Sequence, residues 1–338
     1  MPQSLAEAYD VLLFDLDGVV YIGGIAIPGA PEALREARQA GAHVAYVTNN
    51  ASRTPAAVAA LLEGMGAPVT EADVVTSAQA AARLLADELP PKSKVLVIGA
   101  TALRLAVRER GLVPVSTARE NPAAVVQGFG PGVDYGNLAE GGLAVNAGAL
   151  FVATNADSTI PNKLGTAPGN GSLLKVIENA TGATPVVAGK PEPPLHRESV
   201  IRTGARRPLV IGDRLDTDIE AAYNTGTDSL LVLTGVDNPR TATLAPPHRR
   251  PTYIAATLDA LVLPYPEVAA TRSSAACGGW TATLDPSGTL ALTGHGAAID
   301  GLRALTTAAW AASDQRGGLD AAQVAGALDT LAAAGLHI

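Results

Sequence analysis

Short apolar runs that end in polar residues recur along the chain, and helix-forming stretches separate them. The runs lie at 11–14, 44–47, 94–99, 124–127, 208–212 and 230–235. Because polar residues do not alternate with apolar ones inside them, they are typical of strands covered on both faces of a parallel sheet. Stretches rich in Ala, Leu, Glu and Arg predict helices at 27–42, 55–65, 77–87 and 102–110. The alternation predicts an α/β fold.

Proline-rich breaks divide this pattern into parts. Pro90-Pro91 precedes the run at 94–99, where a separate α/β unit begins. A second proline-rich stretch, from Pro246 to Pro266, indicates a linker after the run at 230–235. Beyond it, residues 279–293 predict two strands around an Asp-Pro-Ser-Gly turn, and two helices follow near 298–313 and 320–334.

A hairpin followed by two helices resembles about half of a GNAT acetyltransferase fold. The stretch contains no Gly-rich turn of the kind that binds the pyrophosphate of acyl-CoA in that family. We therefore predict an accessory module that packs or dimerises rather than a second enzyme. His295 lies between Gly294 and Gly296 and is predicted to be a loop residue rather than a catalytic base.

Composition excludes several classes of protein. Of 338 residues, 47% are hydrophobic and 17% charged, which fits a globular protein with a large core. No apolar run reaches the length of a membrane span, and Met1 to Glu7 lacks the pattern of a secretory signal, so a cytoplasmic location is expected. The net charge of −8 argues against a nucleic-acid partner but permits a small anionic substrate in a local basic pocket. The single cysteine, Cys277, excludes an intrachain disulfide and a cysteine metal cluster.

Two carboxylates follow the first apolar run directly. Asp15 and Asp17 come after residues 11–14, and ligands of open α/β sheets bind at the carboxyl ends of the strands. Residues two apart on an extended chain point the same way, so the pair is costly without a cation or a shared proton. The alternative is a simple polar turn, because Asp and Gly are common in turns.

Further polar groups follow other strands. Thr48, Asn49 and Asn50 end the run at 44–47, with Ser52 and Arg53 close by, and such groups either hold anionic oxygens or cap a helix. Lys190, in Gly-Lys-Pro, either binds an anion or is a solvated surface lysine. Three acids follow the run at 208–212 within six residues, and carboxylates so close together suit magnesium. They are Asp213, Asp216 and Asp218.

These strings, in this order, resemble the four motifs of the haloacid dehalogenase (HAD) superfamily of phosphohydrolases. The matching strings are Phe14–Val20, Tyr46–Asn50, Gly189–Pro191 and Pro208–Ile219. The second is similar to the branch that contains nitrophenyl phosphate, pyridoxal phosphate and phosphoglycolate phosphatases. The resemblance implies a Rossmann-like core, with a parallel sheet and helices on both faces, at 1–82 and 187–264. It implies an inserted α/β cap at 83–186, and it leaves 265–338 as a small α+β C-terminal module.

The resemblance also implies site roles. Asp15 would be the nucleophile, Asp17 the general acid and base, and Lys190 the group that neutralises phosphate and keeps Asp15 ionised. Thr48 and Asn49 would bind phosphate. Magnesium would be bound by Asp15, the backbone carbonyl of Asp17 and Asp213, and Asp218 would support this site. Asp216 stands where relatives often carry Asn, which leaves its supporting role open.

The expected substrate is a small phosphorylated metabolite. Asn155, Asp157 and Arg53 are predicted to contact it, and the aromatic content of 4% offers little to stack on a base or pyridine ring. Glycerol 3-phosphate is the first expectation, before phosphoglycolate, nucleoside monophosphates and pyridoxal phosphate. The Gly-rich stretch 166–172 predicts a loop before a helix, but it lacks the Lys-Ser/Thr ending of a nucleotide-binding loop. Two alternatives stay open, a phosphate-sensing scaffold and a bifunctional enzyme with an acyltransferase-like C-terminal module. The oligomeric state also stays open, with a homo-oligomer among the alternatives.

Overall fold

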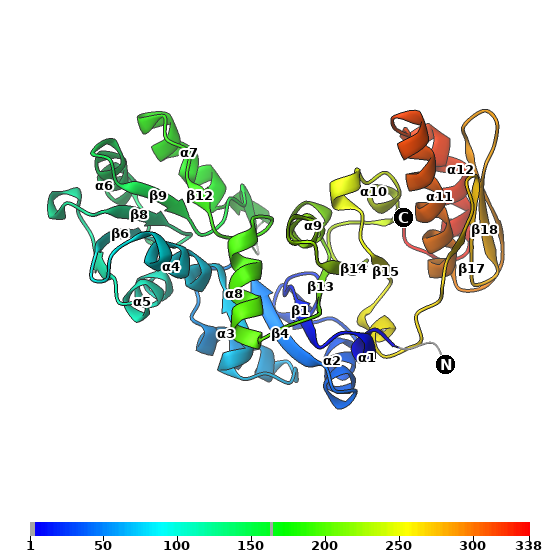
Figure 1. Cartoon of the computed structure of the whole chain (residues 1–338), viewed down its shortest axis with the longest axis horizontal. Coiled ribbons are helices and arrows are strands. Elements are labelled where there is room, and N and C mark those ends of the chain that lie inside the picture. Colours follow the sequence, from blue (N-terminus) through cyan, green and yellow to red (C-terminus); the bar gives the residue numbers. More distant parts are fainter. Residues whose placement is uncertain (1–3, 163–164) are drawn as a thin grey trace. The chain divides into compact units, whose positions relative to one another are not determined.

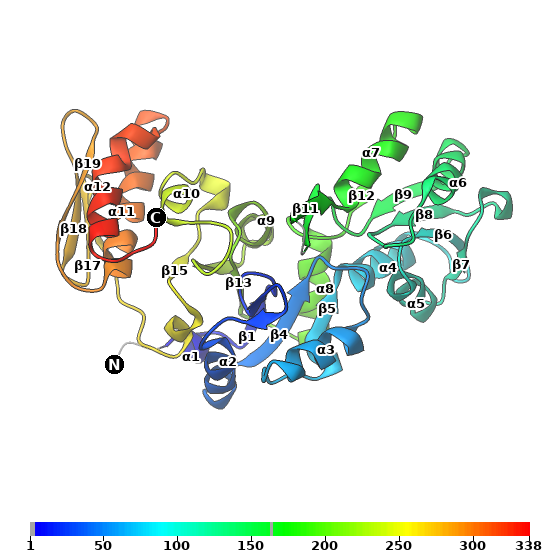
Figure 2. The same ribbon diagram turned by 180° about the vertical axis from the view of Figure 1, so that it is seen from behind.

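The computed structural model describes residues 4–162 and 165–338. These residues form two compact units. The first contains 4–22, 26–43 and 207–338, and the second contains 23–25, 44–162 and 165–206. Figure 1 labels the helices and strands of both units, and Figure 2 shows the same elements from behind.

The first unit carries the apolar runs at 11–14 and 208–212 as neighbouring parallel strands. In that sheet β15, β14, β13 and β1 are neighbours in this order, and all pair in parallel. Its elements before the linker are α1 (Leu5–Ala8), β1 (Val11–Phe14), β2 (Tyr21–Ile22), α2 (Ala30–Gln39), β13 (Pro208–Gly212), the π-helical turn η3 (Leu215–Ile219), α9 (Glu220–Thr225), β14 (Asp228–Val232), α10 (Pro239–Thr243), η4 (Pro247–Arg249), β15 (Tyr253–Ala255) and η5 (Leu258–Leu261). The short β3 (Ile25–Ala26) crosses the boundary between the units.

The register of this sheet fixes where its strands end. Phe14 lies opposite Ile211, and Gly212 lies opposite Leu231. Because all these strands run in one direction, the residues after β1, β13 and β14 emerge at the same edge of the sheet. That edge therefore receives Asp15, Asp213 and the loop that begins at Leu233.

The C-terminal module contains an antiparallel sheet and two helices. The strand order is β16 (Ala269–Ala270), β17 (Ser274–Cys277), β18 (Trp280–Leu284) and β19 (Leu290–Gly294), and α11 (Ala298–Arg316) and α12 (Ala321–Ala333) follow. The predicted hairpin and both helices are confirmed. The sequence did not predict β16 and β17, because Ser-Ala-Ala-Cys carries no branched or aromatic residue that would favour a strand.

The second unit is built around a five-stranded sheet with the order β12-β9-β8-β6-β7, and all its strands are parallel. The unit also contains the parallel pair β4 and β5. Its elements are β4 (His43–Thr48), α3 (Pro55–Gly64), η1 (Glu71–Asp73), β5 (Val74–Thr76), α4 (Ser77–Glu88), β6 (Lys94–Ile98), α5 (Thr101–Glu109), β7 (Val113–Val115), η2 (Ala118–Glu120), β8 (Ala124–Gln127), α6 (Tyr135–Asn146), β9 (Leu150–Ala153), β10 (Thr159–Asn162), β11 (Gly165–Pro168), α7 (Asn170–Thr181), β12 (Val186–Val187) and α8 (Pro193–Thr203).

The prediction of a Gly-rich loop at 166–172 was partly wrong. Residues 165–168 form β11, which pairs antiparallel with β10, and α7 begins at Asn170. Gly169 and Gly171 serve close packing, because a Cβ on either would lie 2.2 Å from the carbonyl oxygen of Asp157 or Ala156. The start of α7 therefore lies against the 156–157 turn.

The fold is an α/β fold with Rossmann-like parallel sheets, an inserted α/β region and a small α+β C-terminal module. The domain boundaries that the resemblance implied, 1–82 and 187–264 for the core, 83–186 for the cap and 265–338 for the C-terminal module, stay predictions. Within the residues described, we find no helix whose length and hydropathy would allow it to span a bilayer.

Candidate active site

Three carboxylates from two strand ends meet in the first unit. Asp15 follows β1, Asp213 follows β13, and Asp218 lies in η3. Each offers an oxygen, and these oxygens lie within 4.8 Å of one another. Asp213 and Asp218 are each only 1% exposed, and Asp15 is half-buried. Three like charges this close repel one another strongly when ionised unless a cation compensates them.

The backbone closes tightly around the Asp213 carboxylate. Val236 donates its N–H to Asp213 Oδ2 at 2.8 Å. A Cβ on Gly18 would lie 2.3 Å from this oxygen, and a Cβ on Gly235 would lie 2.0 Å from it. Gly18 also has a φ of +83°, which favours glycine. Thr234 joins the two glycine segments, because its hydroxyl donates to the Gly18 carbonyl at 2.6 Å.

The Asp218 carboxylate accepts hydrogen bonds from residues at and near the start of η3. Its Oδ2 accepts from the backbone N–H of Arg214 at 3.2 Å and from the Thr217 hydroxyl at 3.4 Å. A Cβ on Gly212 would lie 2.2 Å from the Asp218 side chain, so the strand end needs glycine at this position. These contacts agree with a supporting role for Asp218, which stays a prediction.

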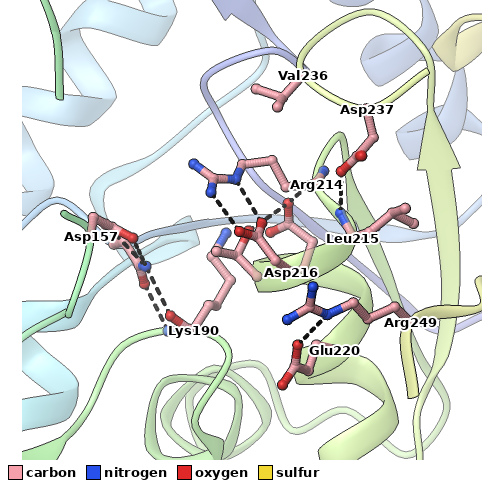
Figure 3. A network of polar contacts seen from close by, with 12 residues as sticks. Asp157, Lys190, Arg214, Leu215, Asp216, Glu220, Val236, Asp237 and Arg249 are labelled. Carbon is pink, nitrogen blue, oxygen red and sulfur yellow. Dashed lines mark hydrogen bonds and ion pairs between the residues drawn. The ribbon is translucent and has the colours of Figure 1, made fainter. Parts of the chain in front are cut away.

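Asp216 turns to a basic partner instead (Figure 3). Arg214 donates to both of its carboxylate oxygens, at 3.0 and 2.9 Å. Partial burial raises the pKa of Asp216, but the bond to Arg214 and the charges of Arg214 and Arg249 outweigh it and hold the pKa below its usual value. Asp216 is thus kept ionised beside an arginine rather than aimed at the carboxylate cluster.

The Asp17 side chain is exposed, and Tyr21 donates to its carboxylate at 3.5 Å. The turn is closed by the backbone, because the Gly18 N–H donates to the Tyr21 carbonyl at 2.8 Å. An exposed carboxylate two residues after Asp15 can exchange protons with a bound substrate and with water.

The donor set at this edge fits a hard divalent cation. All side-chain donors are carboxylate oxygens, which magnesium and calcium prefer over softer metals. Gly18 and Gly235 keep the space beside Asp213 free of side-chain carbon. The residues present therefore fit the magnesium site that the sequence predicted.

The second unit gathers the predicted phosphate-binding residues. Lys190 donates its backbone N–H to Asn49 Oδ1 at 2.8 Å, and Asn49 Nδ2 donates back to the Lys190 carbonyl at 3.1 Å. The Lys190 ammonium donates to the Val47 carbonyl at 3.4 Å, and the side chain is buried. Thr48 is buried as well, and its hydroxyl accepts from the N–H of Asn50. The structure therefore brings Thr48, Asn49 and Lys190 together.

Asn155 and Asp157 contact this group directly, and Figure 3 shows Asp157 beside Lys190. Asn155 Nδ2 donates to the Asn49 carbonyl at 2.6 Å, and Asn49 Nδ2 lies 3.3 and 3.4 Å from the Asp157 carboxylate oxygens. Gly189 permits this packing, because a Cβ there would lie 2.7 Å from Asn49 Oδ1. Both residues thus orient Asn49, whereas Arg53 is exposed. Their predicted contact with substrate stays a prediction.

Sequence reasoning missed the loop after β14. Asp237 accepts the N–H of Leu215 at 2.6 Å (Figure 3), and the N–H of Val236 donates to Asp213. The signal was available, since Thr234–Asp237 is a polar turn after a buried run, and parallel strands bring such turns to one edge. The contact of a backbone N–H such as that of Val236, however, cannot be predicted from the side chains in the sequence.

Replacing Gly235 with Ala should disturb the metal site without disturbing the backbone. The conformation of Gly235 is open to any residue, but the new Cβ would overlap Asp213 Oδ2. We expect the magnesium concentration for half-maximal activity to rise on the order of tenfold, because groups that orient a metal ligand have effects of this size. Magnesium titration of phosphate release measures it. The matched control is Gly132→Ala, where a Cβ meets nothing within 4 Å and the titration should not change.

The chain has Asp carboxylates at the edge of a parallel sheet where the strands end, and it also groups a Lys, a Thr and an Asn. This combination is typical of enzymes that hydrolyse phosphate esters. Family models support this class. Residues 12–113 match a model described as haloacid dehalogenase-like hydrolase, and residues 187–261 match a second HAD-like hydrolase model. Residues 277–336 match a GCN5-related N-acetyltransferase like domain, which agrees with the resemblance noted for the C-terminal module.

Relatives with known names extend over most of the chain. D-glycerol 3-phosphate phosphatase of Mycobacterium tuberculosis is 48% identical over 259 residues, which cover 77% of this chain and 72% of that protein. A 5'-nucleotidase of Bacillus subtilis is 40% identical and covers 68% of this chain and 89% of its own. A crystal structure of glycerol phosphate phosphatase from M. tuberculosis, solved with magnesium, superposes with a TM-score of 0.84 at 42% identity, covering 92% of each chain.

The chain therefore belongs to the haloacid dehalogenase-like hydrolases. It is a phosphomonoester hydrolase of this family, and the resemblance inferred from its motifs is confirmed.

Proposed function

We propose that the protein hydrolyses glycerol 3-phosphate to glycerol and phosphate through a phosphorylated Asp15. The observation that carries the catalytic part is the carboxylate cluster of Asp15, Asp213 and Asp218. The substrate is supported by the 48% identity with a D-glycerol 3-phosphate phosphatase, which extends over most of both chains.

In this mechanism Asp15 attacks the phosphorus atom, and the bond from phosphorus to the substrate oxygen breaks. Asp17 gives its proton to the departing glycerol oxygen. It then takes a proton from a water molecule, which attacks the aspartyl phosphate and releases inorganic phosphate. Asp15 is regenerated, and the carboxyl of Asp17 regains its proton, so one residue serves both half-reactions.

Magnesium is the cofactor of this hydrolase, and in the proposal Asp15, the Asp17 carbonyl and Asp213 would bind it. When bound, it supplies positive charge that offsets the repulsion between the attacking carboxylate and the phosphate. The chain's own part is to hold the ligands in place. Val236 and the two glycines fix Asp213, and Asp218 fixes the turn that follows it.

Lys190, Thr48 and Asn49 would bind the phosphate oxygens in the same step. The Asn49 amide is already oriented by Lys190 and Asp157, so its ordering costs little on substrate binding. Donors held in place before the reaction stabilise developing charge with little reorganisation, and one such donor is typically worth ~3–4 kcal/mol.

Other esters are second candidates. The 40% identity with a 5'-nucleotidase favours a nucleoside monophosphate among them, and phosphoglycolate and pyridoxal phosphate follow. A second catalytic activity in the C-terminal module and a phosphate-sensing role are weaker alternatives. Cytoplasmic location and a homo-oligomeric state stay predictions.

A panel of small phosphomonoesters tests the proposal. We expect magnesium-dependent phosphate release with the highest kcat/KM on glycerol 3-phosphate, and none in excess chelator. The panel contains glycerol 3-phosphate, phosphoglycolate, pyridoxal phosphate and nucleoside monophosphates at matched enzyme concentration. A higher kcat/KM on another ester would replace the substrate and keep the mechanism, whereas equal rates with and without chelator would reject the metal assignment.

A further inference from the structure

The C-terminal module shares one hydrophobic core with the segments that hold the carboxylate cluster. This core joins buried residues of η3, β14, α10 and β15 to buried residues of β17, β18, β19, α11 and α12. Its members on the catalytic side include Leu215, Ile219, Leu231, Ala242 and Ile254. The module therefore does not have a core of its own that is separate from the sheet.

Three of these core residues lie close in sequence to the acids or to the loop that contacts them. Leu215 and Ile219 are the first and last residues of η3, which carries Asp216 and Asp218. Leu231 lies near the end of β14, just before the loop that holds Asp213. Both segments thus bury apolar side chains against the module. Such short elements are held in position mainly by the burial of their apolar surface.

Helix α11 also makes polar contacts with α10 and β15. Trp310 Nε1 donates to the Ala242 carbonyl in α10 at 3.0 Å, and the guanidinium of Arg250 lies 5.8 Å from the Trp310 ring centre. Arg303, 7% exposed, donates to the Ile254 carbonyl in β15 at 3.0 Å. Trp310 and Arg303 are seven residues apart, so they lie on one face of α11. Figure 1 shows α10 beside this helix.

Helix α10, which Trp310 contacts, is connected to the proposed metal ligand Asp213 through the loop that precedes it. Helix α10 begins at Pro239, directly after the loop of Val236 and Asp237. Val236 donates to Asp213, and Asp237 accepts from the N–H of Leu215. A shift of α10 would therefore move both the donor to Asp213 and the anchor of η3.

We infer that the C-terminal module is a positioning element of the phosphatase site, and that Trp310 on α11 holds the 235–237 loop in the arrangement that binds magnesium. The inference rests on the proposed magnesium site. It assigns the module a role in the hydrolase reaction that requires no chemistry of its own.

The test compares magnesium binding by full-length variants in titration calorimetry, with kcat/KM as a second measurement. Trp310→Ala removes both the ring and the hydrogen bond, and we expect magnesium to bind about tenfold more weakly, as for other groups that orient a metal ligand. Trp310→Phe keeps a ring and removes only the N–H, so its magnesium affinity should fall about twofold to threefold, the lower end of what one hydrogen bond contributes.

Leu103→Ala is the control for loss of stability alone. Leu103 is fully buried in α5 of the second unit, so its truncation should lower the melting temperature and leave magnesium affinity unchanged. Magnesium affinity of Trp310→Phe and Trp310→Ala equal to that of the wild type would overturn the inference. If Trp310→Ala does not fold, Trp310→Phe decides. Failure of the wild type itself to bind magnesium would instead reject the proposed site.

Discussion

Asp15→Asn is expected to abolish phosphate release while the protein stays folded. An amide is a very poor nucleophile towards phosphorus, so the loss of kcat should be on the order of 10⁴-fold or more, the scale seen when a nucleophile is removed. Asn has almost the shape of Asp, and β1, which precedes this position, is fully buried. Phosphate release on glycerol 3-phosphate and the melting temperature would be measured on the same sample.

The control is Asp329→Asn, the same change at an exposed position of α12, which should leave both quantities unchanged. The outcome also separates the proposed function from a phosphate-sensing role, because a sensor has no rate to lose. Retention of more than a tenth of the wild-type rate by Asp15→Asn would exclude Asp15 as the nucleophile.

Asp213→Asn is expected to remove magnesium dependence together with activity. The amide oxygen can still accept the Val236 N–H, so the loop should keep its shape, but the charge that attracts the cation is lost. We expect kcat/KM to fall on the order of 10³-fold, a loss comparable to that of one strong electrostatic contact in a transition state. Without magnesium, the variant should melt at the same temperature as the wild type or higher, because one of three mutually repelling charges is gone.

Thermal melts with and without magnesium check this prediction, since a ligand that binds only the folded state raises the melting temperature. Wild-type protein should be stabilised by magnesium, and Asp213→Asn should not. Asp216→Asn is the matched control, because the Asp216 carboxylate is bound by Arg214, and this variant should keep the magnesium effect. Equal stabilisation of Asp213→Asn and the wild type would remove Asp213 from the metal site.

Local sequence was sufficient to predict the strand ends and the acids placed on them. The runs at 11–14 and 208–212 contain no polar side chain, and short apolar runs of this kind, bounded by turn residues, are typical of buried strands. Parallel strands direct their carboxyl ends to one edge, and the resemblance to the HAD motifs implied that Asp15 and Asp213 meet there, although about 200 residues separate them. Motif strings then supplied the family.

Local sequence was insufficient where a contact depends on the backbone of a distant segment. The donor from Val236 and the close approach of Gly18 and Gly235 to Asp213 are set by the register of β1, β13 and β14. The sequence also gave no sign that the Asn155 side chain donates to the Asn49 carbonyl, whereas its predicted contact with substrate stays a prediction. Backbone donors and glycine contacts have no periodicity that a sequence can display.

The C-terminal module shows the same division most clearly. By itself the sequence determined a hairpin and two helices after a proline-rich linker, because turn residues and apolar spacing specify each element locally. Only the tertiary structure decided that these elements share a core with η3 and α10, and that Trp310 meets Ala242. Apolar burial has no direction, so the pattern of a helix says which face is covered but not which segment covers it.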